Sequence, residues 1–187
     1  MSNFRRKLSL AGLGLIFAAG TAGAQLGVKG GNAPLAAGST AAEADLGASE
    51  GSLLRFTEAN KAWVISARVA IGNTSFDPAG PGGSQSSSTM DIGVAFGRRS
   101  YSGSGRFRPF TGFGGVLGFN DDGNTDGFEI GPYFQMGGVY FVAERLSVGA
   151  SSNVSLVYQS TNQGGGGKTT GFQLQGSLIN VMASVYF

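Results

Sequence analysis

The sequence predicts an all-β protein: an antiparallel, up-and-down transmembrane β-barrel of about eight strands that follows a cleaved signal peptide. Three observations lead to this prediction. The N-terminus combines positive charge with a short apolar run, as in export signals. Apolar residues then alternate with small or polar residues almost to the end of the chain, a period that only β-strands have. Finally, only 13% of residues are charged, while 34 are glycine and 14 are phenylalanine, which suits a surface that faces lipid.

The first 24 residues have the three parts of a secretory signal peptide. Arg5, Arg6 and Lys7 precede an apolar run over residues 8–19, and Ala22-Gly23-Ala24 forms an A-x-A type cleavage site. The apolar run is too short for a spanning helix, which needs about 20 residues. We therefore expect residues 1–24 to be removed on export, leaving residues 25–187 as one barrel domain.

Removal of this leader changes the charge balance. The full chain has 13 lysines and arginines against 11 acidic residues, and three of the positive charges lie in the leader. The mature chain would then be slightly acidic, so its apparent basicity does not indicate a nucleic-acid partner. The chain has no cysteine, so the exported fold is expected to form without disulfides.

The alternation marks the strands in order. Six segments carry it clearly, at residues 63–75, 88–101, 107–119, 127–142, 146–160 and 169–187. Two shorter segments, 52–56 and 26–30, bring the expected count to eight, so residues 25–50 are expected to hold the first strand and a loop. The connections alternate between long (78–89, 120–127 and 161–168) and short (57–62, 101–106 and 143–145). External loops and periplasmic turns of outer-membrane barrels differ in this way.

The face opposite the apolar one is expected to fill a narrow lumen. It is rich in glycine and serine and carries a few charges of both signs, namely Arg55, Arg68, Asp91, Arg108 and Glu129. An unpaired buried charge costs several kcal/mol, so charges in a lumen must pair with each other. We expect these five side chains to form a charge network inside the barrel.

Aromatic residues are expected to form two belts at the two membrane interfaces. The belt beside the short connections would contain Trp63, Tyr101, Tyr140 and Phe187. The belt beside the long connections would contain Phe76, Phe119, Phe128 and Tyr158.

The end of the chain resembles the C-terminal assembly signal of outer-membrane barrels. The terminal phenylalanine, Phe187, is preceded at alternate positions by apolar residues, namely Ile179, Val181, Ala183 and Val185. Residues 108–119, RPFTGFGGVLGF, also resemble a strand of the outer-membrane β-barrel domain family, which includes small OmpX- and OmpA-like proteins. The resemblance implies an eight-stranded barrel in the bacterial outer membrane, with membrane lipid and the barrel-assembly machinery as partners. This family is defined by its fold more than by an activity.

Few residues could carry chemistry. The absence of histidine and cysteine removes Ser-His-Asp and Cys-His catalysis and ordinary zinc sites, so we expect neither enzyme activity nor a cofactor. Asp122, Asn124 and Asp126 match the opening of a calcium-binding loop, D-x-N-x-D-G. The glutamate that should close such a loop falls at Tyr133, so a calcium site is the weaker interpretation and an Asp/Gly-rich turn the simpler one.

Three functions remain open at this point. The first is a structural, adhesion or ligand-binding barrel that acts through external loops, because eight strands leave a lumen just wide enough for side chains. The second is a narrow channel for ions or small solutes, which requires a continuous water path past the charge network. The third is a soluble exported barrel that carries an apolar ligand, which requires the apolar faces of the strands to point inward.

Overall fold

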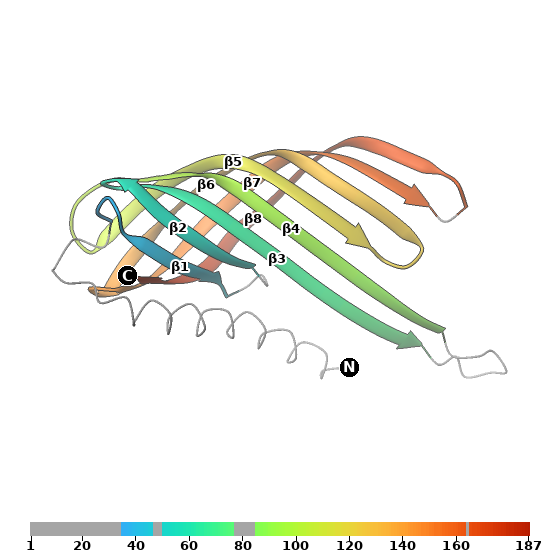
Figure 1. Ribbon diagram of the computed structural model, residues 1–187, viewed down its shortest axis with the longest axis horizontal. Helices are drawn as coiled ribbons and strands as arrows, with labels where there is room; N and C mark the ends of the chain where they lie inside the picture. Colours follow the sequence, from blue (N-terminus) through green and yellow to red (C-terminus); the bar gives the residue numbers. More distant parts are fainter. Residues whose placement is uncertain (1–34, 47–49, 77–84, 164) are drawn as a thin grey trace.

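Eight antiparallel strands form one closed sheet in the computed structural model, which describes residues 35–46, 50–76, 85–163 and 165–187 (Figure 1). The strands are β1 (Thr40–Asp45), β2 (Glu50–Glu58), β3 (Lys61–Phe76), β4 (Gln85–Tyr101), β5 (Phe107–Asp121), β6 (Thr125–Ala143), β7 (Leu146–Gln163) and β8 (Lys168–Tyr186). Each strand pairs with the next along the chain, and β1 pairs with β8. The predicted all-β, up-and-down fold is therefore confirmed. Within these ranges no helix is long and apolar enough to span a membrane.

The two ends of the chain close the sheet. The β1–β8 register runs from Ala41 opposite Tyr186 to Asp45 opposite Met182. One residue past the end of β8, Phe187 continues this pairing. The backbone N–H of Thr40 donates to the carbonyl of Phe187 at 2.9 Å, and the N–H of Phe187 donates to the carbonyl of Thr40 at 2.9 Å. The last residue of the chain is thus hydrogen-bonded to the start of the first strand.

The first strand differs from the prediction. The segment expected to form it, 26–30, lies outside the described residues, and the structure places β1 at Thr40–Asp45 instead. This strand has the sequence TAAEAD, in which alanines occupy both faces and hide the apolar–polar alternation. The inner face is the one that carries Ala41, Glu43 and Asp45, because Ala41 lies opposite the buried Leu54 of β2.

The connections lie at two ends of the barrel, which we call the near end and the far end. The near end holds residues 59–60, 102–106 and 144–145 together with Phe187, and the far end holds residues 122–124, which join β5 to β6, and the start of β8. Two far-end connections are shorter than predicted: residues 122–124 join β5 to β6, and residues 164–167 join β7 to β8. Their polar flanks continue the backbone ladder, because ladder hydrogen bonds do not depend on the side chains that the strands carry.

The two faces of the sheet differ sharply in polarity, and the predicted facing of the six clear strands is confirmed. The outer face exposes the large apolar side chains; on β6, for example, Phe128, Ile130, Phe134 and Met136 are 40–53% exposed. The opposite positions of β6 point inward and include Glu129, which is half-buried. The barrel therefore has an apolar outside and a largely polar inside.

At the near end the interior is apolar instead of polar. A buried cluster fills this end of the barrel, and we call it the near-end plug: Leu35, Ala41, Leu54, Phe56, Ala62, Val64, Tyr101, Phe110, Val139, Phe141, Met182 and Tyr186. Its rings contact each other, with Phe141 and Tyr186 centroids 5.1 Å apart and Tyr101 and Phe110 centroids 5.4 Å apart. Tyr101 points inward with only 6% of its surface exposed, so its assignment to an outer aromatic belt is wrong.

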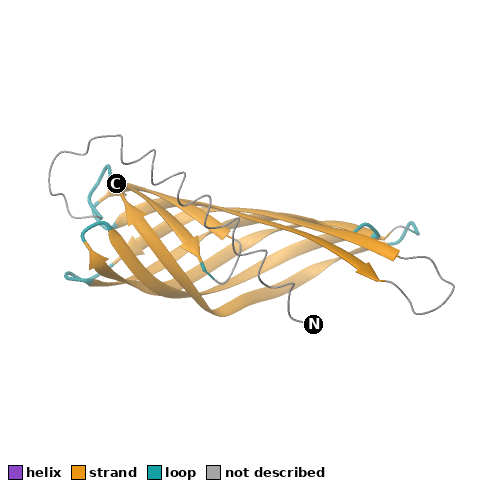
Figure 2. Cartoon of the chain, turned by 90° about the horizontal axis from the view of Figure 1, so that it is seen from below, coloured by secondary structure: helices purple, strands orange, loops and turns teal. Residues whose placement is uncertain are grey.

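The wall of the barrel is uneven in height. β1 and β2 have 6 and 9 residues, whereas their neighbours β8 and β3 have 19 and 16. Figures 1 and 2 show that β3 to β8 continue past β1 and β2 toward the far end. The sheet is closed at the near end and is an open, curved, six-stranded sheet at the far end.

Candidate functional site

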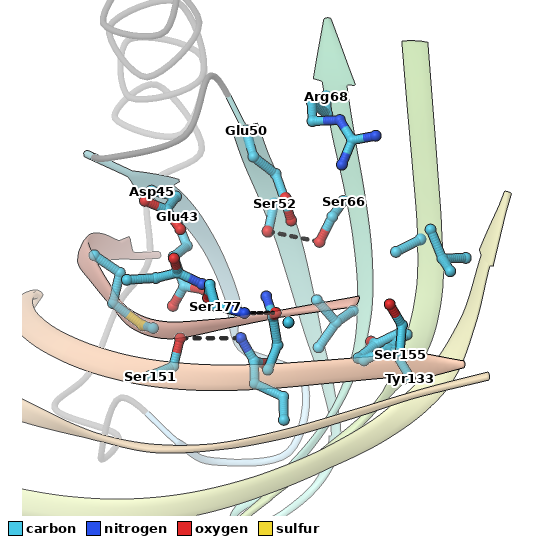
Figure 3. A pocket seen from close by; sticks show the side chains of 18 of the residues that line it. Glu43, Asp45, Glu50, Ser52, Ser66, Arg68, Tyr133, Ser151, Ser155 and Ser177 are labelled. Atoms are coloured by element: carbon cyan, nitrogen blue, oxygen red, sulfur yellow. Dashed lines mark hydrogen bonds between the residues drawn. The ribbon is translucent and has the colours of Figure 1, made fainter. Parts of the chain in front are cut away.

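A polar cavity of about 310 Å³ lies inside the barrel above the near-end plug (Figure 3). All eight strands contribute side chains to it, because inward positions at the same height converge on the barrel axis. β1 to β4 and β6 supply its charged groups, and β7 and β8 supply mainly serine, asparagine and glutamine. This division separates a charged wall from a neutral hydrogen-bonding wall.

The floor of the cavity is a buried ion pair between Arg99 of β4 and Glu43 of β1. The two guanidinium nitrogens of Arg99 donate to the two carboxylate oxygens of Glu43, each at 2.9 Å, and the side chains are only 3% and 5% exposed. Arg99 also donates to the Tyr101 hydroxyl at 3.2 Å and to Gln135 Oε1 at 3.0 Å. Ser184 Oγ donates to Glu43 at 2.9 Å. A buried pair in this setting fixes the arrangement of several strands at once, because each partner would be costly without the other.

A second network lies higher in the cavity, around Arg68 of β3. Its guanidinium donates to Asp91 Oδ1 at 3.0 Å and to Glu129 Oε1 at 3.4 Å, joining β3, β4 and β6. Glu129 accepts further bonds from Gln159 at 3.3 Å and Gln175 at 3.1 Å. Exposure rises along this network to 15% for Glu129, 36% for Arg68 and 45% for Asp91. The cavity therefore opens to its surroundings at this level and is closed at the Arg99–Glu43 floor.

Acidic groups outnumber basic ones around the cavity. Its lining contains four carboxylates but only two guanidinium groups, and both guanidinium groups are already engaged with carboxylates. Asp45 and Glu50 are directly opposite each other on β1 and β2, and Glu50 is in turn opposite Arg68 on β3. The β1–β2 side of the cavity is consequently the more negative side.

Both walls of the cavity also offer hydrogen-bonding groups. Ser52 and Ser66 hydroxyls lie 2.8 Å apart, and Gln135 Nε2 donates to Ser151 Oγ at 3.2 Å (Figure 3). Ser177 Oγ and Arg99 Nε are buried without a hydrogen-bond partner in the structure. Buried polar atoms are normally paired, so these two atoms mark positions where a water molecule or a ligand atom fits.

Of the five residues predicted for the charge network, the structure brings three together, Arg68, Asp91 and Glu129. Arg55 does not join them and its placement in the lumen is wrong: it lies on the outer face, where Nη1 donates to Thr40 Oγ1 at 3.0 Å. Arg108 does not join them either. It sits at the near end and donates to the backbone carbonyls of Gly105 and Gly103 in the connection between β4 and β5.

The strongest ion pair of the interior, Arg99 with Glu43, was not predicted. Glu43 lies in the alanine-rich stretch that gave no strand signal, and Arg99 follows another arginine close to a turn. A signal was present in principle, since Glu43 and Asp45 alternate with alanines and Arg99 has the parity of the inward residues of its strand. Only the register shows that these two positions, 56 residues apart in sequence, meet.

The candidate calcium residues form a tight hairpin turn. Asp122 Oδ1 accepts the backbone N–H of Asn124 at 3.0 Å and of Thr125 at 2.7 Å. A hydrogen bond from the Thr125 side chain, followed by these two backbone bonds, lowers the pKa of Asp122. Asp126 accepts a bond from Asn162 of β7 at 3.1 Å instead of pointing into the turn. Among the described residues no three acidic side chains are grouped to hold a metal ion. The arrangement is that of an Asp/Gly turn.

The residues of the C-terminal signal lie on one face of β8. Ile179 and Val181 are 76% and 48% exposed on the outer face, while Met182, Ser184 and Tyr186 point into the barrel. An extra residue in β8 opposite Ser151 and Asn153 shifts the register there. Its consequence is that Leu178 and Ile179 both lie on the outer side.

Comparison with protein-family models and with curated proteins found no match to this chain. The site must therefore be interpreted from its own chemistry. Its described lining contains hydroxyls, amides, carboxylates and two guanidinium groups, all suited to bind a polar molecule through hydrogen bonds and charge.

Proposed function

We propose that this chain is a bacterial outer-membrane β-barrel protein with a structural or ligand-binding role, and that its binding site is the polar cavity. The observation that carries the proposal is the outer face of the barrel. In the described strands, charged residues on this face occur at two levels only: Arg55, Glu58, Lys61 and Arg98 near one end, and Asp121, Asp126 and Lys168 near the other. Between these levels the outer face is apolar or small and carries no charge.

The height of this apolar band matches a membrane. On β6 it extends over twelve residue steps, from Phe128 to Tyr140. At about 3.4 Å per residue and a strand tilt of about 40°, these steps span about 30 Å, close to the roughly 25 Å band of outer-membrane barrels. The outward side chains at its margins include aromatic rings, with Trp63 stacked on Phe96 at 5.0 Å and Phe128 6.2 Å from Tyr158. Such rings favour membrane interfaces.

The near-end plug argues against a channel. A solute that crossed the barrel would have to displace the buried rings of Phe56, Phe141 and Tyr186 and then pass the Arg99–Glu43 pair. The polar inner wall argues equally against a soluble carrier of apolar ligands, since that function requires the opposite facing of the strands. A cup that is closed at one end and binds a polar group fits both observations.

The first test is membrane fractionation with a urea wash, combined with a comparison of boiled and unboiled samples on a gel. We expect the wild-type protein in the outer-membrane fraction with heat-modifiable migration. Phe134→Arg places a charge within the apolar band, where it costs about 2–4 kcal/mol near the bilayer midplane, so insertion should fall. Asn162→Arg is the matched control, because Asn162 lies on the outer face beyond the band. Wild-type protein in the soluble periplasmic fraction would overturn the proposal.

A further inference from the structure

The uneven wall leaves a notch in the side of the barrel, directly above β1 and β2. We define this lateral notch by the unpaired edges of β3 beyond Arg68 and of β8 before Val181, with Asp45 and Glu50 at its base. β2 pairs with β3 only as far as Arg68. On the other side, the last backbone hydrogen bond to β8 runs from the N–H of Leu46, just after β1, to the carbonyl of Val181. In the described part of the chain, the remaining lengths of β3 and β8 pair on one side only.

The notch leads directly into the polar cavity. Gln175, Ser177 and Asn180 of β8 and Arg68 of β3 line the cavity and belong to or adjoin the unpaired edges. Ser177 Oγ, one of the two buried polar atoms without a partner, lies on the β8 side of the notch (Figure 3). A molecule in the notch could thus reach the cavity without crossing the barrel from end to end.

The outer margins of the notch are apolar. On β8, Phe172, Leu174, Leu178 and Ile179 are 71–89% exposed, more than the corresponding residues of the fully paired β6. On β3, Ile71 is 68% exposed. Under the proposed function these residues place the notch at the depth of the lipid. Unpaired backbone N–H and C=O groups at that depth each cost several kcal/mol, so an occupant must supply hydrogen-bonding groups.

We propose, on the basis of the proposed membrane function, that the notch admits an amphipathic molecule sideways from the membrane. Its polar head occupies the cavity, and its hydrocarbon chain lies against Leu174, Leu178 and Ile179. The head carries positive charge, because Glu50 lies at the base of the notch and carboxylates outnumber guanidinium groups around the cavity. An anionic head would meet net repulsion at the same place.

The test uses the purified full-length mature protein in dodecyl maltoside micelles with a nitroxide-labelled primary alkylammonium as the probe, because its head has both positive charge and N–H donors. We expect an immobilised component in its electron paramagnetic resonance spectrum that saturates at one probe per protein. Unlabelled dodecylammonium should displace it, whereas dodecyl sulfate and methylammonium should be at least tenfold weaker. The first comparison tests the charge of the head, and the second tests the need for a chain.

Two variants locate the bound probe. Glu50→Gln should weaken binding about tenfold, and Ser177→Trp should abolish it by filling the mouth of the cavity. Asp126→Asn is the matched control, since it also removes an acid but on the outer face at the far end, and it should bind as the wild type does. Heat-modifiable migration of each variant verifies that it is folded.

Three results would overturn the inference: no saturable immobilised component, equal displacement by methylammonium, or equal binding by folded Glu50→Gln. Sedimentation that shows a dimer would also overturn it, because a second copy would then occupy the unpaired edges of β3 and β8. Failure of probe binding in a protein that still fractionates with the outer membrane would refute this inference alone. Failure of fractionation would refute the proposed function.

Discussion

Removing the carboxylate of Glu43 should be among the most damaging single changes in this protein. The variant Glu43→Gln leaves Arg99 only 3% exposed and without its ion-pair partner. The neutral amide can replace some hydrogen bonds to Arg99 but not the charge, and breaking a buried ion pair in this way costs about 3–5 kcal/mol. We expect a loss in the free energy of unfolding of about 3 kcal/mol, the lower end of this range.

Urea unfolding of the reconstituted protein measures this loss. Trp63 is the only tryptophan of the chain and lies on the outer face, so its fluorescence reports unfolding and, under the proposed function, loss of insertion. For a urea dependence of about 2 kcal/mol per M, a loss of about 3 kcal/mol lowers the midpoint by about 1.5 M. The double variant Glu43→Gln with Arg99→Met should recover part of the loss, because it removes the unpaired charge.

Glu58→Gln provides the control on the surface. Glu58 accepts bonds from Lys61 and Arg98, both at 2.7 Å, but it is exposed and these pairs are screened by solvent. Its midpoint should stay at the wild-type value. The reasoning would be refuted if Glu43→Gln unfolded at the same urea concentration as Glu58→Gln, or if the losses of the two interior changes simply added in the double variant.

Three further predictions concern the wall, the plug and one turn. Gly114→Ala should lower the urea midpoint, because its methyl group would overlap the backbone of β4, whereas Gly115→Ala, with no atom nearer than 3.8 Å, should be tolerated. Equal midpoints would contradict this packing. Wild-type protein should show no steady conductance in planar bilayers. Tyr101→Ala should show a measurable ion conductance, because it removes a ring from the near-end plug. A conducting wild type would restore the channel hypothesis. Asp122 should titrate below the usual aspartate range in a nuclear magnetic resonance pH titration, so its turn bonds persist above that range and weaken as pH falls through the lowered pKa. Thr125→Val should raise that pKa, and an unchanged value would rule out the side-chain bond.

Local pattern predicted much of the fold because the strands have two chemically different faces. Ile92, Val94 and Phe96 are outward in the structure, as their alternation with small residues indicated. Adjacent side chains of a strand point to opposite faces, so a period of two reports the facing without knowledge of any partner strand. The same argument holds for Glu129, which was predicted to face inward and does so.

The pattern failed where alanine or polar residues hid it. β1 has four residues buried among its six, and alanines on both of its faces, one inside and two outside, leave little contrast between the faces. The far-end strand extensions are polar, so they resembled loops although their backbones pair. In both cases the backbone hydrogen bonds of neighbouring strands decide the structure, and these bonds are not encoded in side-chain polarity.

The sequence by itself determined the all-β class, the facing of six strands and the inward position of Arg68, Asp91 and Glu129. Only the tertiary structure decided which charges meet, because register and barrel closure set the partners of Glu43 and Arg99 from strands distant in sequence. It also decided the near-end plug and the lateral notch. Both depend on the relative heights of neighbouring strands, and a strand's height in the barrel is set by its neighbours through their shared hydrogen-bond register.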